Sequence, residues 1–428
     1  FGSRLASVAQ VPAAVAEPGA MGLAPMGIGL QRTLLFACAL TAHVPLPAVA
    51  DMLPTGGSLV GAYGNWGQCN NQMVQVAEAG ANVLFWFMAD LAADVDGRPT
   101  VQTRLDLLCV TNVSRTLKAR GLATTHLISF GGWCARHPDP KWSGAEWFAV
   151  FDAWNPRDAS TGAVLFDGFD WDFEGCTKRS RFSVQTLNIM GEMSVAAKAA
   201  GYVVSMAPCQ SYFDVETPTF NLFLNNTPAA PWHQDFQYHG RNAYAYLFAY
   251  FGAETFDLVN MQLYESWSPA HYAITNRSTP VEEYVQTWLE VLFAGWEVDF
   301  SSVGGHRKRV SVRPDQLLLG THVYPPVSRS LATKTLALKP SQFHSVWTHL
   351  QAAGKPIPRG VFFWCVACGD SINVTAKLNT FLKTRPPREG RALRMSESWP
   401  GVTDGTRANL PSQLSLSIAL LLLGAWNS

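Results

Sequence analysis

The stretch from Phe166 to Gly175 reads FDGFDWDFEG and places an acid at every second position, at Asp170, Asp172 and Glu174. Successive side chains of a strand point to opposite faces, so a strand here lines up three carboxyl groups on one face and aromatic rings on the other. Three ionised carboxylates within a few ångströms repel one another. At least one of them must therefore hold a proton near neutral pH, which is what a general acid requires.

The alternating acids allow two other interpretations. An exposed acidic edge strand would show the same charge pattern, but the interleaved Phe169, Trp171 and Phe173 make one face apolar and disfavour it. A divalent-cation site can also be built from alternating acids. No histidine or further acid cluster follows to complete a coordination shell, so no metal and no cofactor is expected.

At these residues the sequence resembles the family 18 glycoside hydrolases, the chitinase family, in its compact form. The resemblance implies a single catalytic TIM (β/α)8 barrel with Glu174 as the proton donor. It also implies that the 2-acetamido group of the substrate acts as the nucleophile. Asp172 would orient that group, and Asp170 would share a proton with Asp172.

A barrel needs eight strands separated by helices, and short apolar runs recur along the chain at suitable spacing. The predicted strands are 58–63, 82–87, 124–130, 165–173, 203–207, 256–264, 316–321 and 360–364. The segments 182–200 and 341–353 are examples of the crossover helices between them. This alternation predicts a parallel sheet closed into one barrel, with the catalytic domain spanning residues 51–385.

Further family-like residues fall at predicted strand ends, where a barrel carries its active site. The run Ser129 to Trp133 (SFGGW) resembles the S-x-G-G signature, with Gly131 and Gly132 allowing close packing beneath the acids. Gln262 and Tyr264 resemble a Q-x-Y pattern in which the tyrosine hydroxyl binds substrate. Glu265 departs from the Asp or Asn that is usual next to it.

Aromatic residues near strand ends are candidates for sugar contacts. The resemblance places Trp364 as the floor of the subsite that holds the reacting sugar, and Tyr63 as a partner of the acids. Trp66, Trp133 and Trp267 are candidates for further subsites. The predicted catalytic residues are Glu174, Asp172, Asp170 and Tyr264; the predicted substrate-binding residues are Trp364, Gln262, Tyr63, Trp133, Gly131 and Gly132.

Some chitinases carry a small insertion domain after the seventh strand. The corresponding segment here, from Tyr324 to Gln342, is too short to hold one. We therefore expect an open substrate cleft.

The composition indicates a globular chain without electrostatic bias. Of 428 residues, 48% are hydrophobic, and 32 basic residues balance 32 acidic ones. Nucleic acid is therefore not an expected partner. The expected partner is chitin or an N-acetylglucosamine oligosaccharide, bound by a monomer.

The first 50 residues are interpreted as an upstream segment and a secretory signal, because Arg32 precedes a short apolar run and Ala48-Val49-Ala50 is typical of a cleavage site. Secretion agrees with four N-glycosylation sequons, at Asn112, Asn225, Asn276 and Asn373. Seven cysteines follow the signal, so disulfides are expected with one thiol left over. One bridge is predicted among Cys134, Cys176 and Cys209. The isolated Cys365-x-x-Cys368 pair does not predict a zinc site.

The C-terminal region is predicted to be a polar linker over 386–413 and an apolar tail over 414–428. The almost uninterrupted apolar run from Leu414 to Trp426 has thirteen residues, fewer than the roughly twenty that span a bilayer. With small residues at Asp404-Gly405-Thr406 and a polar spacer, the pattern resembles a GPI-anchor signal. The alternative is a helix that packs on the domain.

These observations predict a chitinase that cleaves β-1,4 bonds between N-acetylglucosamine units with retention of configuration. The enzyme is expected to be secreted and extracellular, and to be GPI-anchored at the cell surface if the tail is such a signal. An endo-β-N-acetylglucosaminidase acting on N-glycans shares nearly the same motif. A lectin on the same scaffold would keep binding without hydrolysis. The presence of Glu174 argues for an enzyme over a lectin.

Overall fold

Eight parallel strands close into a ring in the computed structural model of the chain. Their order is β1-β11-β10-β7-β6-β5-β4-β2, and β2 pairs back with β1. The strands of the ring are β1 (Leu59–Tyr63), β2 (Val83–Ala93), β4 (Thr125–Gly132), β5 (Gly168–Phe173), β6 (Val203–Met206), β7 (Leu258–Met261), β10 (Leu317–His322) and β11 (Gly360–Trp364). The (β/α)8 barrel predicted from the sequence is confirmed, and each strand overlaps its predicted range.

The structure describes residues 52–54, 57–175, 181–223, 240–264, 268–323 and 336–383. The predicted signal segment, polar linker and apolar tail lie outside these residues. So do Cys176, Asn225, Glu265 and Trp267, and most of the short segment after the seventh barrel strand.

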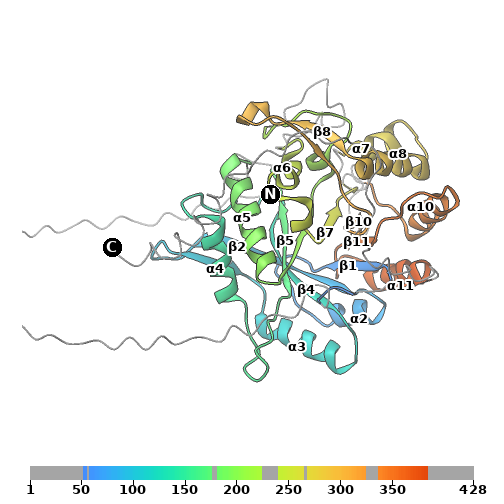
Figure 1. The fold of residues 1–428 in the computed structure, drawn as a ribbon. Helices are drawn as coiled ribbons and strands as arrows, with labels where there is room; N and C mark the ends of the chain where they lie inside the picture. The colour runs from blue at the N-terminus through green and yellow to red at the C-terminus, as the bar shows by residue number, and fades with distance from the viewer. Residues whose placement is uncertain are drawn as a thin grey trace, which may run out of the picture. The chain divides into compact units, whose positions relative to one another are not determined.

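Helices connect the strands and surround them, as Figure 1 shows. They are α2 (Gln72–Glu78), α3 (Leu107–Ala119), α4 (Gly144–Trp154), α5 (Val184–Ala199), α6 (Ala243–Phe251), α8 (Val281–Ala294), α10 (Pro340–Ala352) and α11 (Ser371–Lys383). Three of them begin where a side chain caps the free backbone N–H groups: Asp106 before α3, Ser143 before α4 and Ser183 before α5. The N-termini of α3, α4 and α5 are therefore determined by capping residues in the local sequence.

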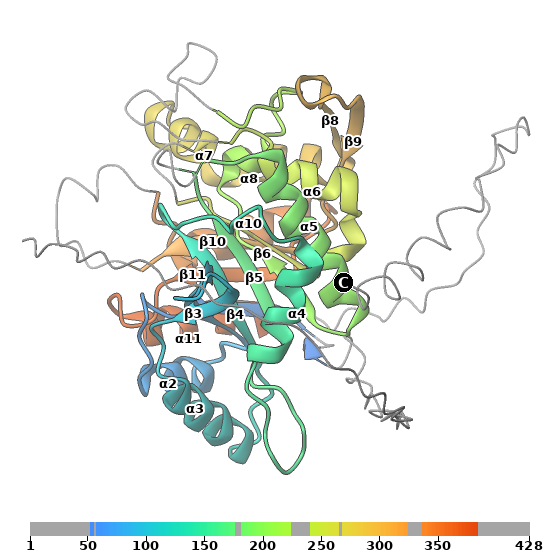
Figure 2. The same ribbon diagram turned by 90° about the vertical axis from the view of Figure 1, so that its left-hand side faces the viewer.

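Three strands were not predicted from the sequence. β3 (Pro99–Thr103) pairs antiparallel with the far half of β2, and β8 (Trp296–Asp299) forms a hairpin with β9 (Arg307–Val310). Figure 2 shows the hairpin beside α6, where Lys308 Nζ donates to the carbonyl of Ala249 at 2.9 Å. Strands this short, with polar residues such as the RKR of β9, lack the hydrophobic alternation that identifies the barrel strands.

Short helical turns complete the described chain. They are η1 (Gln210–Phe213), η3 (Ala253–Thr255), α7 (Pro269–His271), η4 (Tyr272–Asn276) and η5 (Ser301–Val303).

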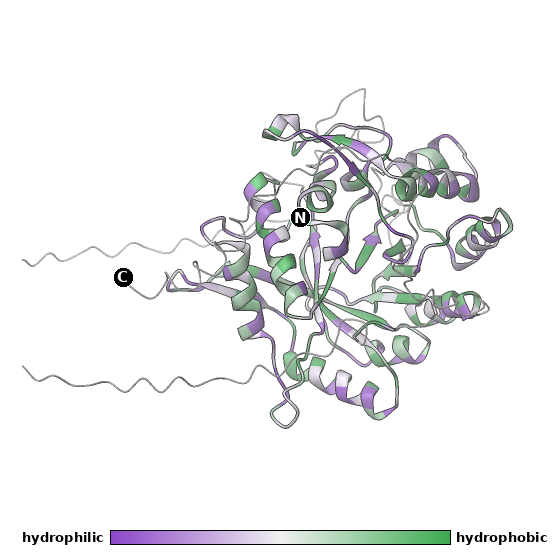
Figure 3. Ribbon diagram, viewed as in Figure 1, coloured by the Kyte–Doolittle hydropathy of each residue, from purple (hydrophilic) through white to green (hydrophobic). Residues whose placement is uncertain are grey.

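The core has two layers because alternate strand residues face opposite ways. Phe169, Trp171 and Phe173 of β5 belong to the layer between strands and helices, where Trp171 Nε1 donates to Ser194 on α5 at 2.8 Å. The barrel interior holds a second cluster that includes Leu59, Val83, Leu127, Val203, Leu258 and Leu318. Figure 3 shows hydrophobic residues along the barrel strands. The acids of β5 therefore point into the barrel.

Within the described residues, none of the helices combines the length and the apolar character needed to cross a membrane.

One buried ion pair joins two connecting segments beside the barrel. Arg241 Nε donates to Asp214 Oδ2 at 2.8 Å, and the two side chains are only 10% and 1% exposed. Burial raises the pKa of Asp214, and Arg241 lowers it. The carboxylate depends on the guanidinium, because an unpaired charge at this depth is costly.

We predict that Arg241→Met lowers the free energy of unfolding by about 3–5 kcal/mol, since it leaves the Asp214 charge buried and unpaired. Urea denaturation at pH 7 measures this. The control is Arg313→Met, which removes an ion pair with Asp315 whose side chains are 49% and 57% exposed; it should cost less than about 1 kcal/mol. Equal effects from the two variants would contradict the prediction.

Candidate active site

Asp170 and Asp172 of β5, and Glu174 directly after its last residue, lie one above the other towards the C-terminal end of the strand. Asp170 is 0% exposed, while Asp172 and Glu174 are each 5% exposed. Carboxylates this deeply buried are stable only when hydrogen-bond donors or a shared proton compensate for lost hydration.

Asp170 is held by donors from four other strands. Tyr63 Oη and Ser129 Oγ each donate to its Oδ2 at 2.9 Å, and Asn260 Nδ2 donates to Oδ1 at 3.3 Å. Ser205 also hydrogen-bonds it. The parallel register explains the arrangement, since Asp170 pairs with Ser129 on one neighbouring strand and with Ser205 on the other.

Burial and these donors act on Asp170 in opposite directions. Burial raises the pKa of Asp170 to about 6, and the four hydrogen bonds limit the rise. Burial, with the nearby Asp170 and Asp172, raises the pKa of Tyr63 well above its ordinary value. Tyr63 therefore stays protonated and donates to the carboxyl at working pH.

Asp172 and Glu174 are joined by one amide. Gln262 Nε2 donates to Asp172 Oδ1 at 2.8 Å and to Glu174 Oε1 at 3.2 Å, and it also donates to the Ala207 carbonyl at 2.8 Å. Gln262 was predicted to bind substrate. In the structure its nitrogen faces the two acids.

Glu174 has the features of a general acid. Burial raises its pKa from an ordinary 4.5 to about 7, against hydrogen bonds from Gln262 and Asp172 that lower it. Its Oε2 atom is buried and has no hydrogen-bond partner among the described residues. A carboxyl with this pKa is substantially protonated at pH 7 and below, and it has one oxygen that is not engaged by the described part of the protein.

Gly131 and Gly132 pack against the acids and the rim. Both have positive φ, at 113° and 99°, a region that disfavours other residues. A Cβ at Gly131 would lie 2.7 Å from the Asp172 carbonyl carbon, and one at Gly132 would lie 2.3 Å from the Phe87 ring. Glycine is therefore required at Gly131 for the close approach of β4 to β5, and at Gly132 for the close approach to the Phe87 ring on β2.

Aromatic rings gather around the mouth of the barrel. Trp364 is 9% exposed and packs edge-on against Phe87 at 4.6 Å between ring centroids. Trp66 lies edge-on to Trp364 at 6.1 Å and is 45% exposed. Tyr264 packs against the hydrophobic cluster in the barrel interior, and its ring centroid lies 6.0 Å from that of His322. These rings extend from the acids towards solvent.

Trp133 follows Gly132 directly, just beyond the end of β4, and its side chain is partly exposed.

Several polar residues of the site were missed in the sequence. Asn260 and Ser205 face Asp170, and His322 stands next to Trp364 in the register of β10 with β11. Burial lowers the pKa of His322 to about 4, so it is neutral at working pH. The available signal was the alternation of interior positions: Asn260 precedes Gln262 by two residues, and His322 follows directly after a predicted strand.

The structure pairs four of the cysteines directly. Cys69 pairs with Cys109 and Cys365 with Cys368. Cys134 is disulfide-bonded as well. Cys209 is a buried thiol, in agreement with the expectation that one thiol is left over. The bridge predicted among Cys134, Cys176 and Cys209 stays a prediction, because Cys176 lies outside the described residues.

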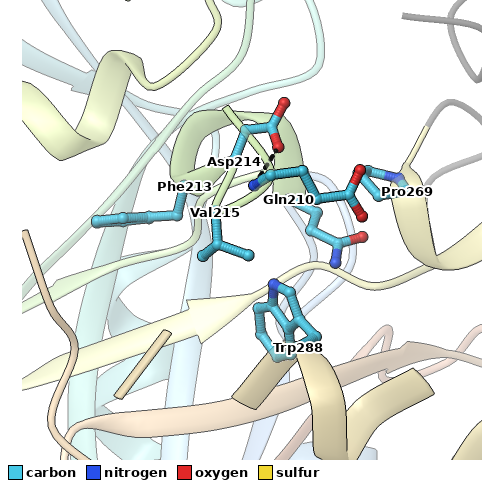
Figure 4. Close-up of a pocket in the computed structure, with 7 residues that line it drawn as sticks. Gln210, Phe213, Asp214, Val215, Pro269 and Trp288 are labelled. Carbon is cyan, nitrogen blue, oxygen red and sulfur yellow. Dashed lines mark hydrogen bonds between the residues drawn. The ribbon is translucent and has the colours of Figure 1, made fainter. Parts of the chain in front are cut away.

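Two other features bear on possible ligand sites. No group of three or more His, Cys, Asp or Glu residues suited to a metal ion occurs in the described part of the chain. Figure 4 shows a small hollow near the Asp214 ion pair, lined by Gln210, Phe213, Asp214, Val215, Glu216, Pro269 and Trp288. None of the predicted catalytic or substrate-binding residues lines it.

The fold and the site together define a (β/α)8 barrel with a buried carboxyl cluster at the C-terminal ends of its strands. No protein-family profile and no curated protein sequence matches the chain.

Several solved structures are similar to it. A GH18 chitinase from Pseudoalteromonas aurantia is 12% identical over 76% of this chain and 99% of its own, with a TM-score of 0.46. A fungal endo-β-N-acetylglucosaminidase of glycosyl hydrolase family 18 is 11% identical over 76% and 98%, with a TM-score of 0.48. A xylanase and α-amylase inhibitor protein from Scadoxus multiflorus is 14% identical over 77% and 100%, with a TM-score of 0.44.

The raised pKa of Glu174 predicts a pH-dependent cost in stability. A carboxyl whose folded pKa is raised stabilises the fold fully below its unfolded pKa, and the contribution is lost as pH rises through the folded value of about 7. Glu174→Gln removes this titration. We predict equal melting temperatures near pH 4 and a higher one for the variant at pH 8, by calorimetry. A difference that stays constant from pH 4 to pH 8 would contradict this.

Proposed function

We propose that the protein is a chitinase of the glycoside hydrolase family 18 type, hydrolysing β-1,4 bonds between N-acetylglucosamine units. The observation that carries the proposal is the unequal surroundings of three carboxyl groups, two on β5 and one directly after it. Asp170 receives four donors, Asp172 is held by Gln262, and Glu174 has a pKa near 7 and one buried oxygen without a partner among the described residues. This suits one proton donor supported by two carboxylates.

The proposed first step uses Glu174 as the acid. Glu174 gives its proton to the glycosidic oxygen while the bond from that oxygen to the anomeric carbon breaks. The carbonyl oxygen of the sugar's own 2-acetamido group forms a bond to the same carbon, which yields an oxazolinium ion. No protein carboxylate bonds to the sugar.

Asp172 has the supporting task in this step. Its carboxylate would accept the acetamido N–H, orient the group and balance the positive charge that develops. Its position two residues before Glu174 on the same face agrees with this. Tyr264 would hold the acetamido oxygen in line, and Trp364 would form the floor beneath the sugar. Asp170, with its donors, would take up or release the proton of the pair.

In the second step water gives a proton to Glu174 and bonds to the anomeric carbon, which opens the oxazolinium ring. Two displacements at one carbon retain the original configuration. The enzyme ends the cycle with Glu174 protonated again.

We further propose that the protein is secreted. The pairs Cys69–Cys109 and Cys365–Cys368 suit an oxidising compartment, and the sequon residues Asn112, Asn276 and Asn373 are exposed. A GPI anchor remains a proposal from the sequence of the tail.

We predict that Glu174→Gln lowers turnover of chitotetraose by at least about 10²–10⁴-fold while substrate binding is kept, because the amide cannot donate the proton. Steady-state kinetics and calorimetric titration measure the two properties. Glu290→Gln, the same change at a 43%-exposed carboxyl on α8, should leave turnover unchanged. An active Glu174→Gln enzyme would mean that the acid is another residue. Release of intact N-glycans without cleavage of chitotetraose would favour an endo-β-N-acetylglucosaminidase, and binding without hydrolysis a lectin.

We also predict that partially deacetylated chitin is cut only where the sugar forming the new reducing end is N-acetylated, because that sugar supplies the nucleophile. Sequencing of the products by mass spectrometry tests this. A neutral thiazoline mimic of the intermediate should inhibit, since it makes contacts that the ground state lacks. Reducing ends that carry free glucosamine as often as the polymer does would exclude acetamido participation.

A further inference from the structure

Gln262 lies between the two upper acids and a buried thiol. It follows β7, and its backbone N–H donates to the Pro208 carbonyl at 2.9 Å, which forms a bridge between Gln262 and Cys209 in parallel register. Both side chains are 1% exposed. The segment after β6 therefore presents Cys209 directly to the side chain of Gln262.

The hydrogen bonds of the Gln262 amide determine which way it faces. Its nitrogen donates to the carboxyl groups of Asp172 and Glu174 and to the Ala207 carbonyl. Its oxygen accepts from the Cys209 thiol, with Sγ 3.7 Å from Oε1. A flipped amide would set its oxygen against carboxylate and carbonyl oxygens and its nitrogen against the thiol hydrogen. The thiol is thus the donor that matches the amide oxygen.

We infer that Cys209 is a positioning residue: its thiol holds the Gln262 amide so that the amide nitrogen stays on both Asp172 and Glu174. The inference deepens the proposed function, because it concerns how the same acids are held. Cys209 itself would not touch the substrate.

The hydrogen bond that Gln262 donates affects the pKa of Glu174. A donor to a carboxylate favours the ionised form, and the hydrogen bond from Gln262 lowers the pKa of Glu174 against the effect of burial. An amide that is held less firmly donates less well on average. Glu174 would then keep its proton to a higher pH.

Other ionisable groups lie near Asp172 and Glu174. They are Asp170 on β5, Tyr63 on β1, Tyr212 on η1, Tyr244 on α6 and Tyr264 after β7. Burial raises the pKa values of Tyr63 and Tyr244 well above the ordinary value, so neither is charged at the pH of the test.

The test is the pH dependence of kcat/KM for chitotetraose in the full-length protein. For Cys209→Ala we expect the alkaline limb to move to higher pH by about half a unit, since a hydrogen bond contributes about 0.5–1.5 kcal/mol and one pKa unit is about 1.4 kcal/mol. Cys209→Ser keeps a donor and should restore the wild-type limb. Gln262→Met removes the amide donor and should move the limb further, by roughly one unit.

A double-mutant cycle decides whether Cys209 acts through Gln262. In the Gln262→Met background, Cys209→Ala should produce no further shift of the limb. The same half-unit shift in that background would overturn the inference, because the thiol would then act independently. A lower melting temperature without any shift of the limb would overturn it too, since that is the result of lost packing alone.

A second measurement separates this inference from the proposed function. If no N-acetylglucosamine substrate is cleaved, the chitinase proposal fails, but the titration of Glu174 can still be followed without substrate. The stability difference that Glu174→Gln produces grows with pH and levels off near the folded pKa of Glu174. When the same substitution is made in the Cys209→Ala background, the pH at which the difference levels off should rise. An unchanged pH would overturn the inference by itself.

Discussion

The burial of three carboxyl groups, two on one face of β5 and one directly after it, is the constraint on which the rest of the interior depends. Charges at this depth are stable only with donors or a shared proton, and β5 cannot supply these to itself. The donors come from β1, β4, β6 and β7, so the barrel must close in the correct register for the acids to be tolerated. The hydrogen-bond donors that the acids need are therefore in place only once the barrel has closed.

The hydrogen-bond donors differ from one acid to the next, and this difference gives the acids different chemical roles. Asp170 lies deepest and receives hydroxyl and amide donors, which favours a carboxylate in spite of burial. Glu174 lies nearer the mouth, where donors are fewer, and burial dominates its pKa. One strand thus presents identical functional groups in unlike surroundings, which separates proton donor from supporting carboxylate.

The packing around the acids leaves little freedom for their neighbours. Gly131 approaches the backbone of Asp172 so closely that any side chain there would collide with it. The Gln262 amide nitrogen donates to Asp172, Glu174 and a backbone carbonyl, and its oxygen accepts from the Cys209 thiol. Preorganised contacts of this kind hold the carboxyl groups before substrate arrives, so that little reorganisation is needed during reaction.

The sequence by itself determined the barrel strands, their inward faces and the three acids, because alternation and apolar runs are local properties of the chain. It also predicted Tyr63 as a partner of the acids, and the structure shows it donating to Asp170; the substrate-binding roles of Gln262 and Trp364 stay predictions. Only the tertiary structure decided that Ser129, Ser205 and Asn260 surround Asp170, that Gln262 faces the acids, and that Cys209 is a thiol beside it. Contacts between strands depend on register and closure, which bring together residues far apart in the chain, such as Tyr63 and Asn260, which are 197 positions apart. No local pattern encodes such pairs, and burial, which sets the pKa values, exists only once the barrel has closed.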